Sequence, residues 1–219
     1  FQSLAYKELL PSGGPVRTQM VGMPTAEKEA QSQRVKDYMN YQIMNEMKEY
    51  EAEFDQMLFY LPLSGSAFKK VYYDEVMERT VSKFVPADDL VVPYTATSLD
   101  DAESIIHVVK MSENELRKQQ VGGFYRDVEI TPGSEHESES EKRERELGGV
   151  SKGRSQNTFT LFECHVNLDL EGFEDVNPED NEPTGIKLPY IVTIDEASKE
   201  VLSIRRNYEI GDKKKSKID

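Results

Sequence analysis

The chain has no tryptophan, one cysteine and three histidines among its 219 residues. The single cysteine, Cys164, excludes an internal disulfide and any zinc site built from several thiolates. No apolar run approaches the roughly 18 residues that a membrane-spanning helix needs, so we expect no membrane contact. The chain begins with Phe1 and shows no basic-then-apolar leader, and we expect it to be a piece of a longer polypeptide.

Positive charge is also scarce, since 27 Lys and Arg residues face 41 Asp and Glu residues and give a net charge of −14. A protein that grips nucleic acid needs positive charge to release counterions from the phosphates. The balance therefore argues against a general nucleic-acid binder. It remains compatible with a surface along which DNA slides without sticking.

Helical spacing of apolar residues marks the first quarter of the chain. A short helix over Phe1–Leu10 should end at the Pro- and Gly-rich segment 11–15. A second helix should begin after Thr25, whose hydroxyl suits an N-cap. Its apolar stripe runs on to Leu61, which predicts a long helix with a kink near Tyr50. We interpret the stripe as core-facing, and its methionines leave a partner-binding groove open as the alternative.

Beyond Gly65 the apolar period changes from 3.6 to two, which predicts strands. The expected elements are a hairpin of Ala67–Tyr73 and Thr80–Val85, a short helix near Asp100, a strand over Ile105–Met111, a helix capped by Ser112 that ends at Gly122, a strand from Thr158, and a hairpin of Leu188–Asp195 and Glu200–Tyr208.

These patterns predict an α+β fold, in which long helices are followed by antiparallel β-hairpins and short helices. The segment 131–157 is rich in Glu, Ser and Gly and poor in apolar residues, so we expect an acidic flexible loop there. The expected regions are a helical part (1–62), a hairpin and strand with short helices (63–130), the acidic loop (131–157), an antiparallel β region (158–210) and a basic tail (211–219).

The candidate catalytic and ligand-binding residues all have simpler structural interpretations. Cys164 and His165 are neighbours on a strand and point to opposite faces, so they cannot easily pair as nucleophile and base. We expect Cys164 to be a small core residue, His165 to face solvent, and His107 to be a core histidine. With His136 in the acidic loop, the histidines have no metal-ligand spacing. We expect no metal site, no cofactor and no catalytic residue.

Two further motifs give only weak evidence for a phosphate-binding or catalytic site. The segment Gly65–Lys70 is only faintly like a phosphate-binding loop, because a strand and not a helix follows it. Asp88-Asp89 and Asp100-Asp101 sit beside turn-forming residues and suit turns and caps better than acid–base catalysis. We therefore expect the protein not to be an enzyme.

Arg205 and Arg206 are the two residues that we single out as structural or inter-subunit contacts. Strand alternation places Arg206 on one face with Leu202, Ile204 and Tyr208. A guanidinium on an apolar face needs a carboxylate or carbonyl partner. We therefore expect Arg206 to be less exposed than Arg205.

Several stretches, taken in order, resemble the portal proteins of tailed double-stranded DNA bacteriophages, especially the short-tailed type. They cover most of the chain from Phe1 to Tyr208 but none of the acidic loop. The stretches are Glu8–Pro15, Leu61–Val71, Phe84–Pro93, His107–Ser112, Pro189–Asp195 and Val201–Tyr208.

The resemblance implies a wing-like part of a subunit in a homo-oligomeric ring, usually of twelve copies, at one capsid vertex. Double-stranded DNA would pass through the ring during packaging and ejection. The implied partners are the terminase and the capsid and tail adaptor proteins. The implied location is the virion, after assembly in the host cytoplasm.

Two alternatives remain open. One is a stand-alone α+β domain that binds or hydrolyses an unknown small molecule, for which a concave pocket with convergent polar groups would be evidence. The other is a structural scaffold unrelated to phage. Large apolar patches left exposed on a single subunit would instead favour the ring.

Overall fold

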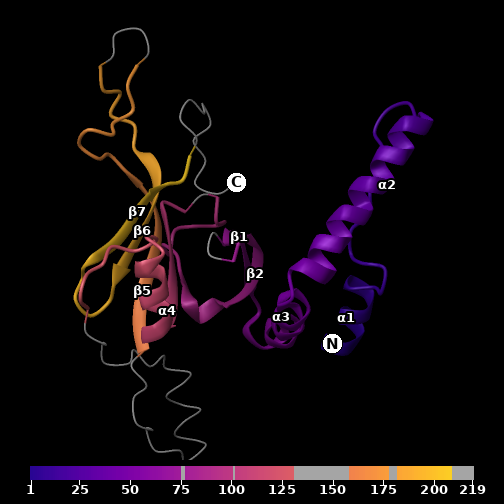
Figure 1. Ribbon diagram of the computed structural model, residues 1–219, viewed down its shortest axis with the longest axis horizontal. Helices are drawn as coiled ribbons and strands as arrows, with labels where there is room; N and C mark the ends of the chain where they lie inside the picture. The colour runs from indigo at the N-terminus through magenta and orange to yellow at the C-terminus, as the bar shows by residue number, and fades with distance from the viewer. Residues whose placement is uncertain (75–76, 101, 131–157, 178–181, 209–219) are drawn as a thin grey trace, which may run out of the picture. The chain divides into compact units, whose positions relative to one another are not determined.

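The computed structural model describes residues 1–74, 77–100, 102–130, 158–177 and 182–208 (Figure 1). The described residues combine helices with antiparallel sheets, so the α+β class is confirmed. The chain divides into two compact units, Phe1–Ala87 and Asp88–Asp219. The acidic segment 131–157 and the basic tail 211–219 lie outside the described residues.

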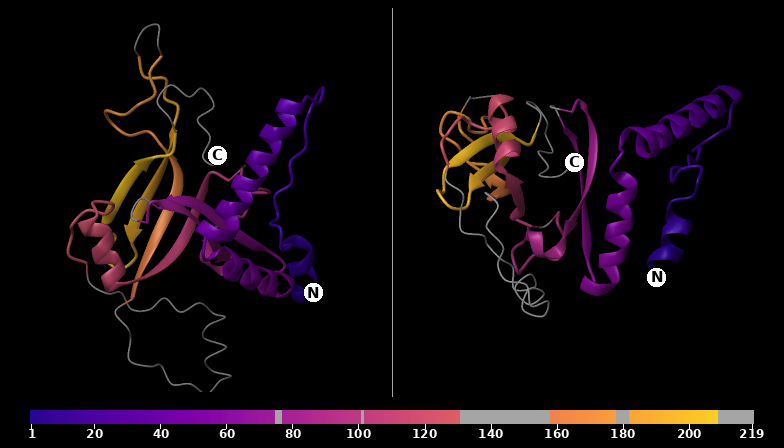
Figure 2. Two further views of the ribbon diagram at one scale, coloured as in Figure 1. Left: turned by 45° about the vertical axis from the view of Figure 1, so that its right-hand side comes forward. Right: turned by 60° about the horizontal axis from the view of Figure 1, so that its bottom comes forward.

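The first unit begins with helices. They are α1 (Gln2–Leu9), α2 (Ala26–Tyr41), the π-helical turn η1 (Gln42–Glu46) and α3 (Tyr50–Ser64). The expected N-cap of α2 is confirmed, because Thr25 Oγ1 accepts a hydrogen bond from the amide of Lys28 at 3.3 Å. Figure 2 shows α1 lying beside α3 and α2 meeting α3 at an angle.

The long apolar stripe does not form one helix. After the π-helical turn, Met47 takes a ψ of 76° and leaves the helical region. The expectation of one long helix with a kink near Tyr50 is therefore wrong, because the chain breaks fully between η1 and α3. The far end also differs, because α3 continues past Pro62 to Ser64. Gly65 then ends the helix with a φ of +77°, a conformation that suits glycine.

The hairpin of β1 (Ala67–Asp74) and β2 (Arg79–Pro86) is confirmed, and α3 packs against it. Two carboxylates from the helix side reach the outer edge of β2. Glu49 Oε1 accepts the amide hydrogen of Ser82 at 3.1 Å, and Glu53 Oε2 accepts that of Phe84 at 2.6 Å. Glu49 also pairs with Arg79 at 2.8 Å. The main-chain donors of an edge strand are thereby satisfied by helix side chains.

The Glu49 carboxyl group titrates below its ordinary range. Burial alone raises its pKa, but hydrogen bonds from its own amide and from that of Ser82, together with the Arg79 guanidinium, lower the pKa overall. The carboxylate therefore stays ionised, which strengthens its hydrogen bonds to the strand.

Lys69 of β1 extends over the aromatic side chains of α3. Its Nζ lies 3.4 Å from the centroid of the Tyr50 ring and 5.0 Å from that of Phe54. The Nζ atom is buried and has no hydrogen-bond partner among the described residues. Burial lowers the pKa of the Lys69 ammonium to about 8, although the charge of Glu53 opposes the shift. The aromatic rings and the charge of Glu53 therefore both stabilise its charged form.

This burial makes the stability of the first unit pH-dependent. The pKa of Lys69 is about 8 in the folded state, against an ordinary value of 10.5. Between these values the unfolded state binds more protons, so the free energy of unfolding should rise as pH rises from 8 to 9.5. Urea unfolding at several pH values measures this free energy. Lys69→Met is the control, and its stability should change less over the same interval; equal slopes for both proteins would contradict the prediction.

The second unit is built on one five-stranded antiparallel sheet with strand order β3-β4-β5-β6-β7. Its elements are the 3-10 turn η2 (Ala87–Asp89), β3 (Leu90–Val91), β4 (Ser104–Ser112), α4 (Glu113–Val121), β5 (Thr158–Leu168), β6 (Leu188–Asp195) and β7 (Val201–Arg206). The expected cap of α4 is confirmed, with Ser112 Oγ accepting the amide hydrogen of Glu115. The short helix expected near Asp100 is wrong, because Leu99 and Asp100 form a turn.

The sheet carries an apolar cluster on each face. On the face that α4 covers, the buried cluster comprises Leu116, Tyr125, Phe159, Leu161 and Leu202. On the other face it comprises Leu188, Tyr190 and Val192, with Cys164 and Val166 packed against it. Figure 1 shows β5, β6 and β7 side by side, with α4 beside them. Burial on both faces fits the mostly apolar sequence of β6, which has buried residues at successive positions.

Leu202 should be a sensitive position of this core. Its side chain is 0% exposed, whereas Ile204, on the same strand, is 52% exposed. Leu202→Ala should lower the free energy of unfolding by about 2–5 kcal/mol, because it leaves a cavity. Ile204→Ala is the matched control and should cost about 0.5 kcal/mol or less. Urea unfolding followed by circular dichroism measures both, and equal losses would contradict the observed burial.

Candidate interaction site on strand β7

An irregularity in the pairing of β6 with β7 decides which way each β7 side chain points. Thr193 pairs with Ser203, but the next residue, Ile194, pairs with Val201, so Leu202 is an extra residue on β7. Such a β-bulge puts two successive side chains on the same face. Leu202 accordingly joins the cluster under α4, and the neighbouring Ser203 hydroxyl donates to Thr193 Oγ1 at 3.2 Å.

Arg205 lies on the same face as Ser203 and stacks on an aromatic ring. Its guanidinium carbon is 3.4 Å from the centroid of the Phe124 ring, and the residue is half-buried. The stack forms part of a hollow of about 530 Å³ between the segment after α4 and β7. The segments that line the hollow are Gly123–Arg126 and Val201–Arg205.

Arg126 was not singled out from the sequence, although it connects the two segments that line the hollow. Its amide donates to the Leu202 carbonyl at 2.8 Å, and its Nη1 donates to the Val201 carbonyl at 3.0 Å. The segment after α4 therefore contacts the outer edge of β7 at Val201 and Leu202, the beginning of the strand. Local periodicity gives no signal for this contact, because the paired residues are 75 positions apart.

Arg206 occupies the opposite face of the sheet. It pairs in register with Tyr190, and its guanidinium carbon is 5.2 Å from the centroid of the Phe173 ring. The rings of Tyr208 and Tyr190 pack edge to face, with their centroids 6.0 Å apart. Burial and the Tyr208 hydroxyl raise the pKa of Tyr190 to about 12, while Arg206 acts in the opposite direction.

The expected order of exposure of the two arginines is wrong. Arg206 is exposed and Arg205 is half-buried. Strict alternation grouped Leu202 with Ile204 and Arg206, but the extra residue at Leu202 separates it from them. The arginines keep their place as candidate contact residues, now with Arg205 and Arg206 on opposite faces of an edge strand.

The cysteine and histidine candidates are spread over the second sheet. Cys164 points to the same face as Val166 and packs on the apolar cluster there, as expected. Burial raises the pKa of its thiol, and the charge of Glu163 adds to the shift. His165 points to the other face, but its side chain is only 20% exposed, with Nε2 3.0 Å from Glu163 Oε1. The expectation that His165 faces solvent is therefore wrong.

The structure describes the positions of most of the remaining motifs. His107 is half-buried on β4, and strand alternation places it with Ile105. His136 lies outside the described residues. A strand follows Gly65, as expected for a segment that is not a phosphate loop. Asp88 and Asp89 end the 3-10 turn η2. Within the described residues, no group of three or more His, Cys, Asp and Glu side chains could hold a metal ion.

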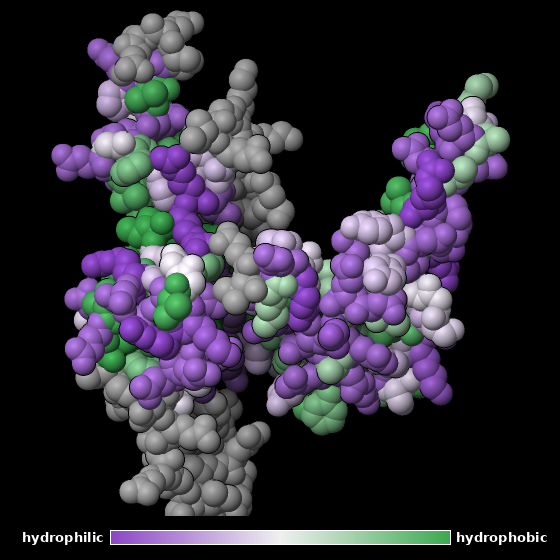
Figure 3. All heavy atoms as spheres, viewed as in Figure 1, coloured by the Kyte–Doolittle hydropathy of each residue, from purple (hydrophilic) through white to green (hydrophobic). Residues whose placement is uncertain are grey.

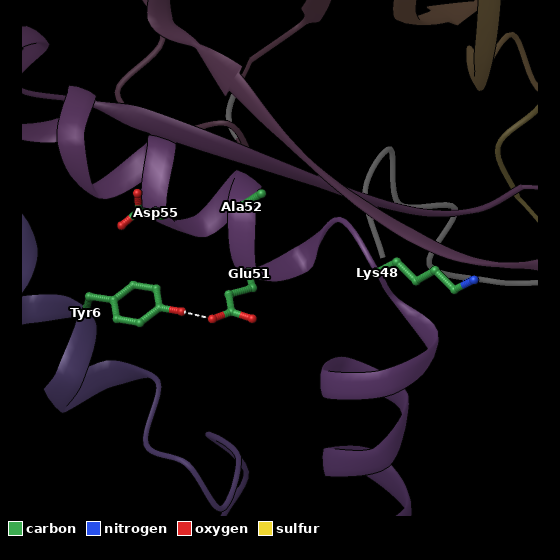
Figure 4. A pocket seen from close by; sticks show the side chains of 5 residues that line it. All are labelled: Tyr6, Lys48, Glu51, Ala52 and Asp55. Atoms are coloured by element: carbon green, nitrogen blue, oxygen red, sulfur yellow. Dashed lines mark hydrogen bonds between the residues drawn. The ribbon is translucent and has the colours of Figure 1, made fainter.

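A second hollow lies between α1 and α3 in the first unit. It has a volume of about 440 Å³ and contains Tyr6, Lys48, Glu51 and Asp55. Figure 4 shows the Tyr6 hydroxyl donating a hydrogen bond to Glu51, with Lys48 extending away from them. This hydrogen bond, with burial and the nearby carboxylates, raises the pKa of Tyr6 to about 12. These contacts attach α1 to α3.

Comparison with models of known protein families and with curated proteins found no match to this chain. A search of the described helices found none long and apolar enough to cross a membrane.

The stack of Arg205 on Phe124 should be measurable as a coupling energy. A double-mutant cycle of Arg205→Ala and Phe124→Ala should give about 0.5–1 kcal/mol of coupling in urea unfolding. The control cycle pairs Arg206→Ala with Phe124→Ala and should give none, because Arg206 lies on the opposite face. Coupling in the control cycle, or its absence in the first, would contradict the geometry.

Proposed function

We propose that this chain is all or part of a bacteriophage portal subunit, a structural component and not an enzyme. In this proposal identical copies form a ring, of the twelve subunits usual in portal proteins, at one capsid vertex. Double-stranded DNA passes through the ring, and the ring engages the terminase, the capsid and the tail adaptor. The subunit is made in the host cytoplasm and ends in the virion. The ordered set of resembling stretches between Phe1 and Tyr208 supports this proposal.

The structural observation that carries the proposal is the exposed apolar surface of α2. Val35, Tyr38 and Met39 lie at helical spacing and are 46%, 61% and 43% exposed; we call them the α2 apolar patch. Asn40 is the only buried residue of this 16-residue helix. Apolar residues interrupt the hydrophilic surface along α2 (Figure 3). A helix with so little buried surface gains stability from a partner, and identical copies are the simplest partner.

The charge of the chain is the second support. A net charge of −14 repels the phosphate backbone, as a conduit that must release DNA requires. The same charge disfavours a role in which the protein holds DNA tightly. The two hollows described above both open widely to the surface, so neither is the enclosed pocket that would favour the alternative of a small-molecule domain.

Assembly of the complete natural polypeptide that contains these residues tests the proposal. Negative-stain electron microscopy and native mass spectrometry should show closed rings. The variant Val35→Glu/Met39→Glu should reduce ring formation at least tenfold, because it places charges inside an apolar contact. Ala30→Glu adds charge to another face of α2 and is the matched control, which should assemble normally.

The circular dichroism spectrum of the Val35→Glu/Met39→Glu variant should match that of the unchanged protein, so that its loss of assembly is not a loss of folding. Rings that are required for DNA uptake in a terminase-driven packaging assay would support the portal role. A complete polypeptide that stays monomeric, or one that turns over a small substrate, would overturn it.

A further inference from the structure

The outer edge of β7 carries main-chain groups that are placed to pair with another strand. The Asn207 amide donates inward, to the Pro189 carbonyl, at 3.0 Å. Because main-chain groups alternate in direction along a strand, those of Ile204 and Arg206 point outward. Arg126 already pairs with the outward carbonyl of Leu202. Within the described part of the chain, no further residue hydrogen-bonds to the outward main-chain groups of Ile204 and Arg206.

Cationic side chains flank this edge in a strongly acidic chain. Arg205 borders it on the face that α4 covers, and Arg206 borders it on the opposite face. Arg126 stands at its end, on the rim of the 530 Å³ hollow. The edge therefore concentrates three guanidinium groups, in a protein whose net charge is −14. Their charge is complementary to an acidic partner.

The two faces beside the edge differ in chemistry. The α4 side offers the hollow with Phe124, Arg126 and Arg205. The other side offers Ile204, which is 52% exposed. An added strand directs successive side chains to opposite faces. A segment that alternates acidic and apolar residues would therefore place its carboxylates toward the hollow and its apolar residues beside Ile204.

We propose that the outer edge of β7 binds an extended segment of a partner protein, with alternating acidic and apolar residues, as an added strand. This mode of recognition uses main-chain hydrogen bonds for affinity and alternate side chains for specificity. A peptide fits better than a nucleic acid, because the outward amide and carbonyl groups match a peptide main chain. The inference goes beyond the portal ring and does not depend on it.

The probe is a fluorescein-labelled peptide, Glu-Val-Glu-Val-Glu-Val-Glu, titrated with the purified chain and followed by fluorescence anisotropy. It should bind, and a peptide of equal charge with proline in place of valine should bind at least tenfold more weakly. Proline removes amide donors and disfavours the strand conformation. On binding of the valine peptide, amide exchange should slow at Ile204 and Arg206, which a purely electrostatic contact would not produce.

Side-chain variants locate the site. Arg126→Ala and Arg205→Ala should each weaken binding of the valine peptide several-fold, and the double variant at least tenfold. Arg34→Ala removes an exposed cation from α2 and should leave binding unchanged. Arg126 is exposed, so Arg126→Ala should retain the circular dichroism spectrum of the unchanged protein. It therefore tests the site even if Arg205→Ala destabilises the fold.

Four results would overturn the proposal: no binding of the valine peptide, equal binding of the proline peptide, unchanged exchange at Ile204, or equal weakening by Arg34→Ala. Displacement of the peptide by a single-stranded oligodeoxynucleotide at similar concentration would assign the edge to nucleic acid instead. A chain that is dimeric by light scattering, and becomes monomeric in the Arg126→Ala/Arg205→Ala variant, would assign it to self-association.

Discussion

One extra residue in β7 determines the arrangement of the second unit. Because Leu202 is inserted between two regular pairs, its side chain enters the core under α4 instead of facing outward with Ile204. Every later side chain on the strand takes its direction from this insertion. Arg205 consequently reaches Phe124, and Arg206 reaches the aromatic residues on the other face. Without the bulge, the core leucine and the stacked arginine could not both occupy their places.

The parts of the fold that follow local rules were predictable from the sequence. Thr25 and Ser112 cap their helices because a hydroxyl three residues before an amide is enough to do so. The hairpins follow from period-two patterns and short polar turns. The separation of Cys164 from His165 follows from strand alternation alone. Each of these predictions depends on residues that are close together in the chain.

The features that were missed depend on distant partners. The sequence of β7 contains nothing that marks Leu202 as an insertion, since a bulge is a property of two paired strands. Arg126 meets a strand 75 residues away, so its role has no local signature. The break between α2 and α3 also involves distant residues, because Met47 leaves the helical region and Glu49, just after it, contacts Arg79 and Ser82 on the hairpin. The candidate site was therefore predictable as residue types, but not as geometry.

The two carboxylates on the edge of β2 also restrict which segment copies of this protein could exchange by domain swapping. Glu49 and Glu53 hold β2 to α3, the helix that precedes the hairpin in the chain. A hairpin that moved alone to a neighbouring molecule would leave two amides unpaired and a carboxylate without Arg79. In a domain swap of this region we therefore expect α3 and the hairpin to move together, because a swap of both keeps these contacts.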